Sequence, residues 1–228
     1  MERLIAEKLP TAEGDTVLDV GANIGNHSIF LAEHFGMVHS FEPNPLAFEL
    51  LKINVTHSGL DERVIIHNFG LSDHNGTLPF RTSSQNLGAS RVQNAAGEDS
   101  KRIPVCSLDQ LDLEVEGKIA LIKVDVEGHE LNVLRGSEGI LREHKPAILF
   151  EQSRHDIQNG TSEAISFLES LDYKFFVEVR SFSMGEGLIG RALALVVRSL
   201  LGSKLSFVEV TQFESKYHAL ILALHKDA

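Results

Sequence analysis

Hydrophobic residues recur along this chain in two alternating patterns. Short apolar runs of strand length are each followed by a longer segment in which apolar residues return at helical spacing. The runs predict strands at 16–20, 38–41, 64–68, 120–125, 147–151, 174–179 and 217–225. The segments between them predict helices at 25–35, 45–58, 130–143 and 162–171. Strands that alternate with helices are typical of βαβ units, so we expect an α/β fold with a doubly wound, Rossmann-like sheet.

Two segments interrupt this alternation. Residues 81–101 are polar and rich in Ser, Asn, Gly and Gln, which indicates either a substrate lid or a mobile insert. Residues 187–204 are hydrophobic but carry Arg191 and Arg198, which are seven residues apart and therefore share one helical face. A core helix is the first interpretation of this second segment; a surface for a lipid-like substrate or a membrane, or a dimer face, are the alternatives.

Composition limits the possible classes of protein. With 228 residues, of which 43% are hydrophobic, the chain can bury one sizeable core, and we expect a single domain over 1–228. A formal net charge of −11 argues against a nucleic-acid partner, because neutralising phosphates requires a basic face. Cys106 is the single cysteine, which excludes a disulfide framework and indicates a small core residue.

Nothing in the hydropathy pattern predicts membrane insertion or export. No uninterrupted apolar stretch reaches the roughly 20 residues needed to span a bilayer. Residues 1–10 mix charged and apolar side chains, which predicts a short amphipathic helix and not a secretory signal. We therefore expect a cytoplasmic location.

The most informative motif is the glycine turn that follows the first predicted strand. Dinucleotide-binding turns read G-x-G-x-x-G, because backbone amides must approach the pyrophosphate closely. Here the second glycine position is Asn23 and the third is Asn26, and the pattern is instead D-x-G-x-N-x-G from Asp19 to Gly25, with Gly21 inside it. The turn therefore favours S-adenosylmethionine, which carries no phosphate, over a nicotinamide cofactor.

The ends of this cofactor match residues along the motif. Backbone amides at the helix start after Gly25 suit its carboxylate, while turn carbonyls and Asp19 suit its ammonium group. Glu42 follows the second predicted strand, about twenty residues past the first glycine, where a carboxylate can accept from both ribose hydroxyls. Asp73, after the third strand, can accept from the adenine amino group or simply form a turn.

Four acidic residues close apolar runs and should meet at one edge of the sheet: Asp19, Glu42, Asp125 and Glu151. Methyl transfer to a hydroxyl requires a base, and Asp125 is the first candidate, as base or as positioner of the acceptor. His129 is the alternative, because imidazole titrates near neutral pH. A magnesium ion held by Asp125 and Glu151 is a further alternative, although we expect no metal.

Several motifs together resemble one known group. They are VLDVGANIGNHSIFLA from Val17, FEPNP from Phe41, LSD from Leu71, IKVDVEGHELNVLRG from Ile122 and AILFE from Ala147. The chain resembles the FkbM-like family of class I S-adenosylmethionine-dependent methyltransferases. The resemblance implies a seven-stranded sheet in the order 3-2-1-4-5-7-6 with the last strand antiparallel, and O-methylation of sugar or natural-product hydroxyls.

The same resemblance distributes roles among the motif residues. It places the methionine end of the cofactor on Asp19, Gly21, Asn23 and Gly25, the ribose on Glu42, the adenine on Asp73, and the acceptor on Asp125 and Glu127. The full set that we expect to bind the cofactor is Asp19, Gly21, Asn23, Gly25, Asn26, Glu42, Asp73 and Asp125. The expected catalytic residues are Asp125, Glu127 and His129.

Other functions are weaker interpretations of the same residues. A cofactor-binding module without catalysis would keep the glycine turn, and a lipid-linked acceptor would suit the 187–204 segment. A nucleic-acid methylase is disfavoured by the acidic charge and by the absence of an Asn-Pro-Pro-Tyr motif.

Overall fold

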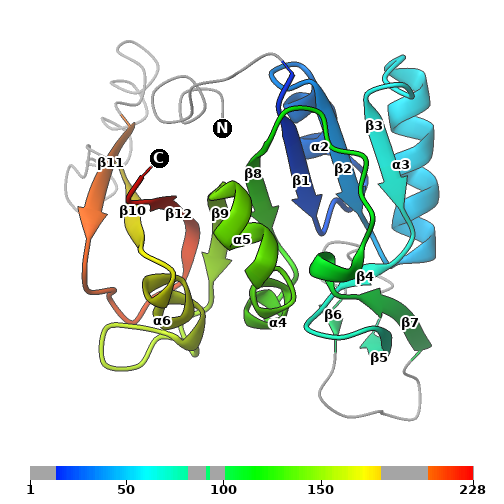
Figure 1. Cartoon of the computed structure of the whole chain (residues 1–228). Coiled ribbons are helices and arrows are strands. Elements are labelled where there is room, and N and C mark those ends of the chain that lie inside the picture. The colour runs from blue at the N-terminus through cyan, green and yellow to red at the C-terminus, as the bar shows by residue number, and fades with distance from the viewer. Residues whose placement is uncertain (1–13, 82–90, 93–100, 181–204, 228) are drawn as a thin grey trace, which may run out of the picture.

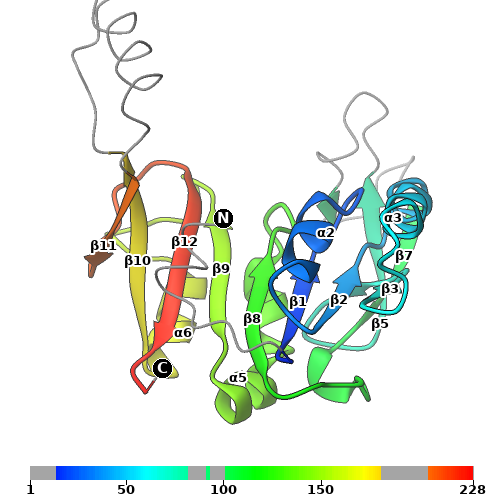
Figure 2. The same cartoon turned by 90° about the horizontal axis from the view of Figure 1, so that it is seen from above.

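A central sheet of eight strands organises the molecule (Figures 1 and 2). The computed structural model describes residues 14–81, 91–92, 101–180 and 205–227. From one edge to the other, the strands are β11 (Leu205–Val210), β10 (Tyr173–Arg180), β12 (His218–His225), β9 (Ala147–Gln152), β8 (Ile119–Val124), β1 (Thr16–Val20), β2 (Met37–Phe41) and β3 (Val64–His67).

The predicted strand order is confirmed for seven of these strands. Five neighbouring strands, β3, β2, β1, β8 and β9, are mutually parallel. The strand β12 runs antiparallel between β9 and β10. The eighth strand corrects the prediction: β11 pairs antiparallel with β10 at the edge of the sheet. Local pattern did not reveal β11, because an edge strand is defined by its distant partner more than by its own hydrophobicity.

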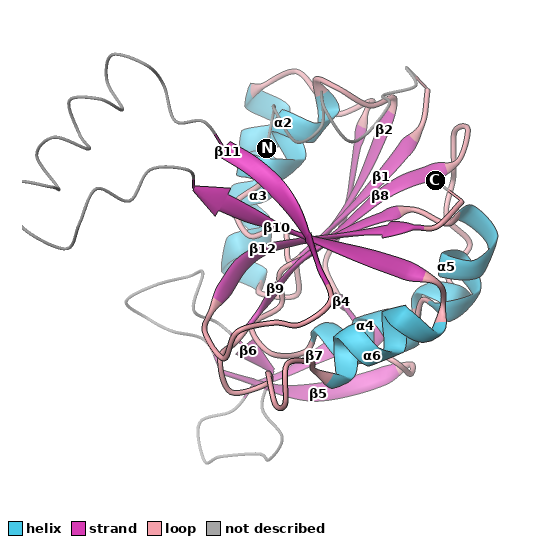
Figure 3. Cartoon of the chain, turned by 90° about the vertical axis from the view of Figure 1, so that its left-hand side faces the viewer, coloured by secondary structure: helices cyan, strands magenta, loops and turns pink. Residues whose placement is uncertain are grey.

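Helices cover both faces of the sheet, as the alternating pattern predicted (Figure 3). One face carries α2 (Asn26–Ala32) and α3 (Pro45–His57). The other carries α4 (Glu130–Arg135), α5 (Glu138–His144) and α6 (Glu163–Ser170). Neighbouring residues of β1 point to opposite faces, so that Val17 packs in the cluster with Leu31 of α2 and Leu18 packs in the cluster with Leu168 of α6.

The single helix predicted over 130–143 is wrong, because the chain forms α4 and α5 with a break at Gly136. The Gly136 carbonyl accepts a hydrogen bond from the amide of Asp109, which lies outside both helices. The helical pattern of backbone hydrogen bonds is therefore interrupted at this residue. The Asp109 carboxylate then accepts from the amides of Gly139 and Ile140 at 2.8 and 3.0 Å. Asp109 therefore caps α5 from a distant part of the chain, which satisfies amides that a helix start leaves unpaired.

A second, smaller sheet lies beyond the carboxyl ends of the central strands (Figure 1). Its strands are β4 (Gly70–Leu71), β7 (Lys101–Cys106), β5 (Gly76–Arg81) and β6 (Arg91–Val92), in that order, and the 3-10 helix η2 (Leu108–Gln110) follows β7. Cys106, which we expected to be a small core residue, ends β7 and is partly buried. The polar segment 81–101 is described only at its ends and in β6, and the segments 1–10 and 187–204 fall outside the described residues.

A histidine pair, of which His39 is buried and His67 is half-buried, joins β2 and β3 within the central sheet. His39 Nδ1 lies 3.0 Å from His67 Nε2, and His39 Nε2 lies 2.7 Å from the carbonyl oxygen of Glu114. Because that carbonyl can only accept, His39 must donate from Nε2, which leaves its Nδ1 to accept from His67. Burial lowers the pKa of His39, and burial together with the nearby His39 lowers the pKa of His67 to about 4.

This pair predicts a loss of stability in mild acid. In the unfolded chain both histidines bind a proton below about pH 6.5, whereas the folded pair resists protonation, so stability falls as the pH drops from that value toward 4. We expect a loss on the order of 2 kcal/mol over this window. Urea titrations between pH 7 and 4.5 should show a smaller loss in His67→Gln, and an unchanged loss in the exposed control His57→Gln.

Candidate active site

The glycine turn after β1 is shaped by three residues with left-handed backbone. The φ angles are +78° at Gly21, +52° at Asn23 and +91° at Gly25. A Cβ on Gly21 would lie 1.9 Å from the carbonyl oxygen of Asp125, so a side chain cannot be accommodated there. The need for glycine at position 21 therefore comes from contact between this turn and the loop that follows β8.

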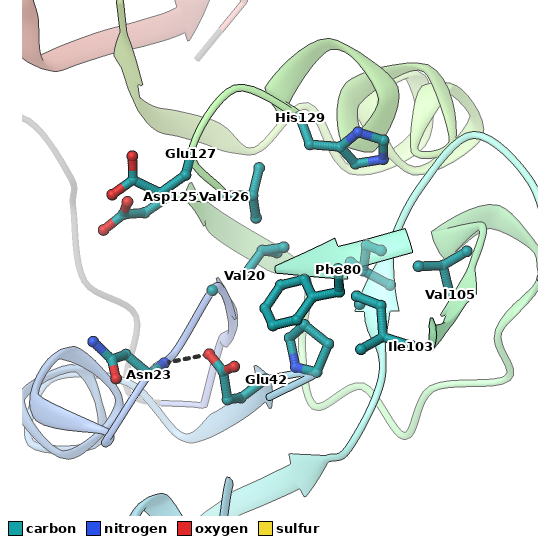
Figure 4. Close-up of a pocket in the computed structure, with 14 residues that line it drawn as sticks. Val20, Asn23, Glu42, Phe80, Ile103, Val105, Asp125, Val126, Glu127 and His129 are labelled. Carbon is teal, nitrogen blue, oxygen red and sulfur yellow. Dashed lines mark hydrogen bonds between the residues drawn. The ribbon is translucent and has the colours of Figure 1, made fainter. Parts of the chain in front are cut away.

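Glu42 is fixed beneath this turn. Its carboxylate accepts from the Asn23 amide at 2.8 Å (Figure 4) and from the Asn44 amide, also at 2.8 Å. Asn44 in turn caps α3 by accepting from the Leu46 amide, with Pro45 at the first helical position. Burial raises the pKa of Glu42, although the two amides oppose this shift. The FEPNP motif is thus a carboxylate held rigidly at the start of a helix.

Asp19 lies below the site and its carboxylate is already engaged. Its side chain is fully buried, and its two oxygens accept from Ser28 Oγ at 2.7 Å and from Lys123 Nζ at 3.0 Å. The predicted contact of Asp19 with the cofactor ammonium must compete with these partners. The structure thus gives Asp19 the role of holding the turn and β8 together.

Lys123 is a site residue that sequence reasoning missed. Its ammonium lies 3.0 Å from Asp19 and 3.5 Å from Asp125. Burial lowers the pKa of Lys123, but the two carboxylates raise it above its ordinary value overall. The available signal was a lysine inside the apolar strand IALIKV, because a buried cation requires a buried anion. Strand register supplies that anion, since Asp19 pairs with Lys123 across β1 and β8.

The turn after β8 presents Asp125 and Glu127 to the pocket side by side (Figure 4). Glu127 has a φ of +53° and Gly128 a φ of +95°, a sharp reversal before α4. The side chain of Glu130 accepts from the Gly128 amide at 3.0 Å and stabilises this turn. In the DVEGHE motif, the carboxylates of Asp125 and Glu127 therefore face the pocket, while the carboxylate of Glu130 stabilises the turn itself.

His129 lies away from these carboxylates, on the far side of Val126 (Figure 4). Its Nε2 lies 3.0 Å from Ser72 Oγ, and Ser72 Oγ also lies 3.1 Å from Asp73 Oδ1. Burial lowers the pKa of His129 despite the opposing charge of Asp73. This placement does not bring His129 to Asp125 and Glu127, with which we grouped it as a catalytic residue.

Unlike His129, Asp73 and Asn26 do not line the pocket. Asp73 accepts from Asn132 Nδ2 at 3.0 Å and is paired with His74 at 2.7 Å, which helps to lower its pKa. Asn26 begins α2 with an exposed side chain. The adenine contact of Asp73 and the cofactor contact of Asn26 therefore stay predictions.

The pocket itself has a polar rim and an apolar wall (Figure 4). The polar part comes from the glycine turn, Glu42 and the loop after β8, and the apolar part comes largely from the second sheet. The lining residues are Val20, Gly21, Asn23, Glu42, Pro43, Gly70, Leu71, Phe80, Ile103, Val105, Asp125, Val126, Glu127 and His129. Among these lining residues, all of which the structure describes, three carry a carboxylate and none is Lys or Arg.

A fourth carboxyl group, that of Glu151, lies next to the rim. Tyr217, which is 58% exposed, donates a hydrogen bond from Oη to Glu151 Oε2. Burial is the largest cause that raises the pKa of Glu151 to about 7, and the carboxylates of Asp125 and Glu127 add to this shift. Sequence reasoning named Glu151 as a strand-end acid but missed Tyr217, which lies far from it along the chain.

Comparison with known families decides the assignment. The family described as "Methyltransferase FkbM domain" matches residues 19–175, more than half of the chain. This chain belongs to the FkbM methyltransferase family. The matched residues extend from Asp19 into β10 and include the glycine turn, Glu42 and the DVEGHE turn.

Two curated relatives of this FkbM-family chain are methyltransferases. It is 36% identical over 141 residues to the hexuronic acid methyltransferase AglP of Haloferax volcanii, an alignment that covers 61% of this chain and 56% of AglP. It is 26% identical over 198 residues to the 31-O-demethyl-FK506 methyltransferase FkbM of Streptomyces tacrolimicus, covering 72% of this chain and 75% of that protein. The chain thus spans little more than half the length of AglP.

A solved structure supports the fold assignment of this family member. The precorrin-6y C5,15-methyltransferase from Geobacter metallireducens matches 98% of this chain and 86% of its own, with a TM-score of 0.51 and 13% sequence identity. At that identity the likeness concerns the arrangement of strands and helices alone.

The described part of this FkbM-family chain contains neither a metal-binding cluster nor a membrane-spanning helix. There, no group of three or more His, Cys, Asp or Glu side chains is arranged to hold a metal ion. Across the same residues, no helix is both long and apolar enough to cross a bilayer.

The Asp19–Lys123 pair predicts a strong coupling in stability. Lys123→Met leaves the Asp19 carboxylate buried without its cation and should cost about 3–5 kcal/mol in the free energy of unfolding. The double variant Asp19→Asn/Lys123→Met removes both charges and should recover much of that loss. Urea unfolding of the wild type, Asp19→Asn, Lys123→Met and the double variant measures the coupling, with the exposed Lys118→Met as control. Strictly additive losses would contradict a direct interaction.

Proposed function

We propose that this chain is an S-adenosylmethionine-dependent O-methyltransferase that acts on a hydroxyl group of a sugar, a glycan or a natural-product-like molecule. The charge of the pocket supports this proposal best. The described lining carries the carboxylates of Glu42, Asp125 and Glu127 and neither Lys nor Arg. The buried Lys123 ammonium nearby is already paired with Asp19 and Asp125, so the lining would repel a pyrophosphate. A sulfonium ion with an ammonium group and a ribose diol suits the same carboxylates.

Individual groups in the pocket fit the parts of this cofactor. Glu42, fixed by two amides, is placed to accept from the ribose hydroxyls. Within the described residues, Asn23 Oδ1 is buried without a hydrogen-bond partner, and an ammonium donor would satisfy it. The apolar side chains of Phe80, Ile103 and Val105 offer a wall for the adenine ring.

The carboxylates at the rim suit a hydroxyl acceptor. When bound, S-adenosylmethionine supplies an electrophilic methyl carbon that is already activated. The protein must then align the acceptor oxygen and accept its proton. Asp125 and Glu127 are placed to receive hydrogen bonds from that hydroxyl, which orients the oxygen.

The relatives support the acceptor class that we propose. AglP is described as a methyltransferase of hexuronic acid, and the Streptomyces protein as a methyltransferase of 31-O-demethyl-FK506. One is a sugar derivative and the other a natural product. Both descriptions agree with an acceptor that presents a hydroxyl group.

Binding and transfer can be tested separately. Calorimetry with S-adenosylmethionine, S-adenosylhomocysteine and NAD should show binding of the first two, and a preference for NAD would overturn the proposal. Transfer of a tritiated methyl group should then be followed across hexuronic acids, neutral monosaccharides and macrolide alcohols. Asp125→Asn should bind the cofactor but lose most turnover; a wild-type chain that binds without transferring would instead be a cofactor-binding module.

Glu42 predicts a specific loss of cofactor affinity. Glu42→Gln keeps the size of the side chain but removes the ionised acceptor, so S-adenosylmethionine and S-adenosylhomocysteine should each bind about 1–3 kcal/mol more weakly. The exposed Glu49→Gln on α3 is the matched control and should bind both normally. Equal affinities for Glu42→Gln and the wild type would show that the ribose is held by other groups.

A further inference from the structure

Two neighbouring strands bring Glu151 and Asp125 together. Val124 of β8 pairs with Phe150 of β9, and each carboxyl-bearing residue follows its member of that pair. Asp125 and Glu151 therefore occupy the same level of the sheet, at the end where the pocket opens. Asp125 lines the pocket and Glu151 stands beside it.

The surroundings of these two carboxyl groups differ. Asp125 lies 3.5 Å from the Lys123 ammonium, with which it forms an ion pair. Glu151 instead accepts from the phenol of Tyr217. Its carboxyl group also shares a hydrogen bond with that of Asp125, and the negative charges of Asp125 and Glu127 act on it from the loop after β8. A carboxylate set among other carboxylates holds a proton more readily than one paired with an ammonium group.

The surroundings of Glu151 destabilise its charged form, and this suits the carboxyl group to proton transfer. Burial and two like charges raise the pKa of Glu151 to about 7, while the Tyr217 hydroxyl acts in the opposite direction. A general base works best when its pKa lies close to the working pH, because it is then both available and basic enough. Perturbed carboxyl groups beside a pocket are frequent at catalytic sites.

We propose that Glu151 accepts the proton of the acceptor hydroxyl during methyl transfer, and that Tyr217 is a positioning residue that holds the Glu151 carboxylate toward the rim. This inference rests on the proposed function. As the acceptor oxygen bonds to the methyl carbon, the carbon–sulfur bond breaks with its electron pair kept by sulfur, and the hydroxyl proton passes to Glu151. The sulfonium charge and the Glu151 charge are thus both neutralised in one step.

A binding measurement tests Glu151 without any acceptor. S-adenosylmethionine carries a positive sulfonium and S-adenosylhomocysteine does not, so binding the former should expel the proton of Glu151 and binding the latter should not. Calorimetry at pH 7 in buffers of different ionisation enthalpy should show about half a proton more released with S-adenosylmethionine. Glu151→Gln should abolish this difference, and the exposed Glu169→Gln on α6 should retain it.

Kinetics then test the roles of both residues, using whichever acceptor of the hydroxyl panel is methylated. Glu151→Gln should lower kcat by roughly 100-fold or more with little change in cofactor affinity. Tyr217→Phe removes a hydrogen bond that favours the charged carboxylate, so the acidic limb of its kcat profile should move to higher pH.

The failures of the two proposals are distinguishable. If the wild type does not bind S-adenosylmethionine, the proposed function is wrong. If it binds both forms of the cofactor with equal proton release, or if Glu151→Gln keeps wild-type turnover, the assignment of Glu151 is overturned while the methyltransferase proposal stands. An unshifted pH profile in Tyr217→Phe would remove the positioning role.

Discussion

The buried ammonium group of Lys123 connects the two loops that form the site. It lies between the carboxylate of Asp19 at the end of β1 and that of Asp125 after β8. It also approaches the carbonyl oxygen of Gly21 at 3.4 Å. Because an unpaired charge inside the sheet would be very costly, these groups must stay together in the folded protein. The glycine turn and the loop after β8 are thereby held at a constant separation.

That separation defines a pocket whose two ends differ in chemistry. Carboxylates gather at the rim beside β8 and β9, where Asp125 and Glu127 face the pocket and Glu151 lies next to them. The opposite wall, formed by the second sheet with Phe80 and Val105, is apolar. A ligand that is cationic at one end and carries a flat ring at the other matches this polarity, and a diphosphate does not.

The region matched by the family contains most, but not all, of this arrangement. Residues 19–175 supply the glycine turn, Glu42, the loop after β8 and Glu151. Tyr217, whose hydroxyl contacts Glu151, comes from beyond this range, just before β12. The glycine turn, Glu42 and the loop after β8 are therefore built from family-matched residues, while the surroundings of Glu151 also include a residue from outside them.

The amino-acid sequence alone determined the α/β class and the carboxylates that close the strands, because hydrophobic period and strand-end chemistry are local properties. The order of seven strands came from the resemblance of its motifs to the FkbM-like family. The sequence did not determine the break at Gly136, the edge strand β11 or the displacement of His129 from Asp125, since each depends on partners far along the chain. Lys123 shows the reason most clearly: it is an unusual residue within its own strand, and only the register of β8 against β1 sets its charge between two carboxylates.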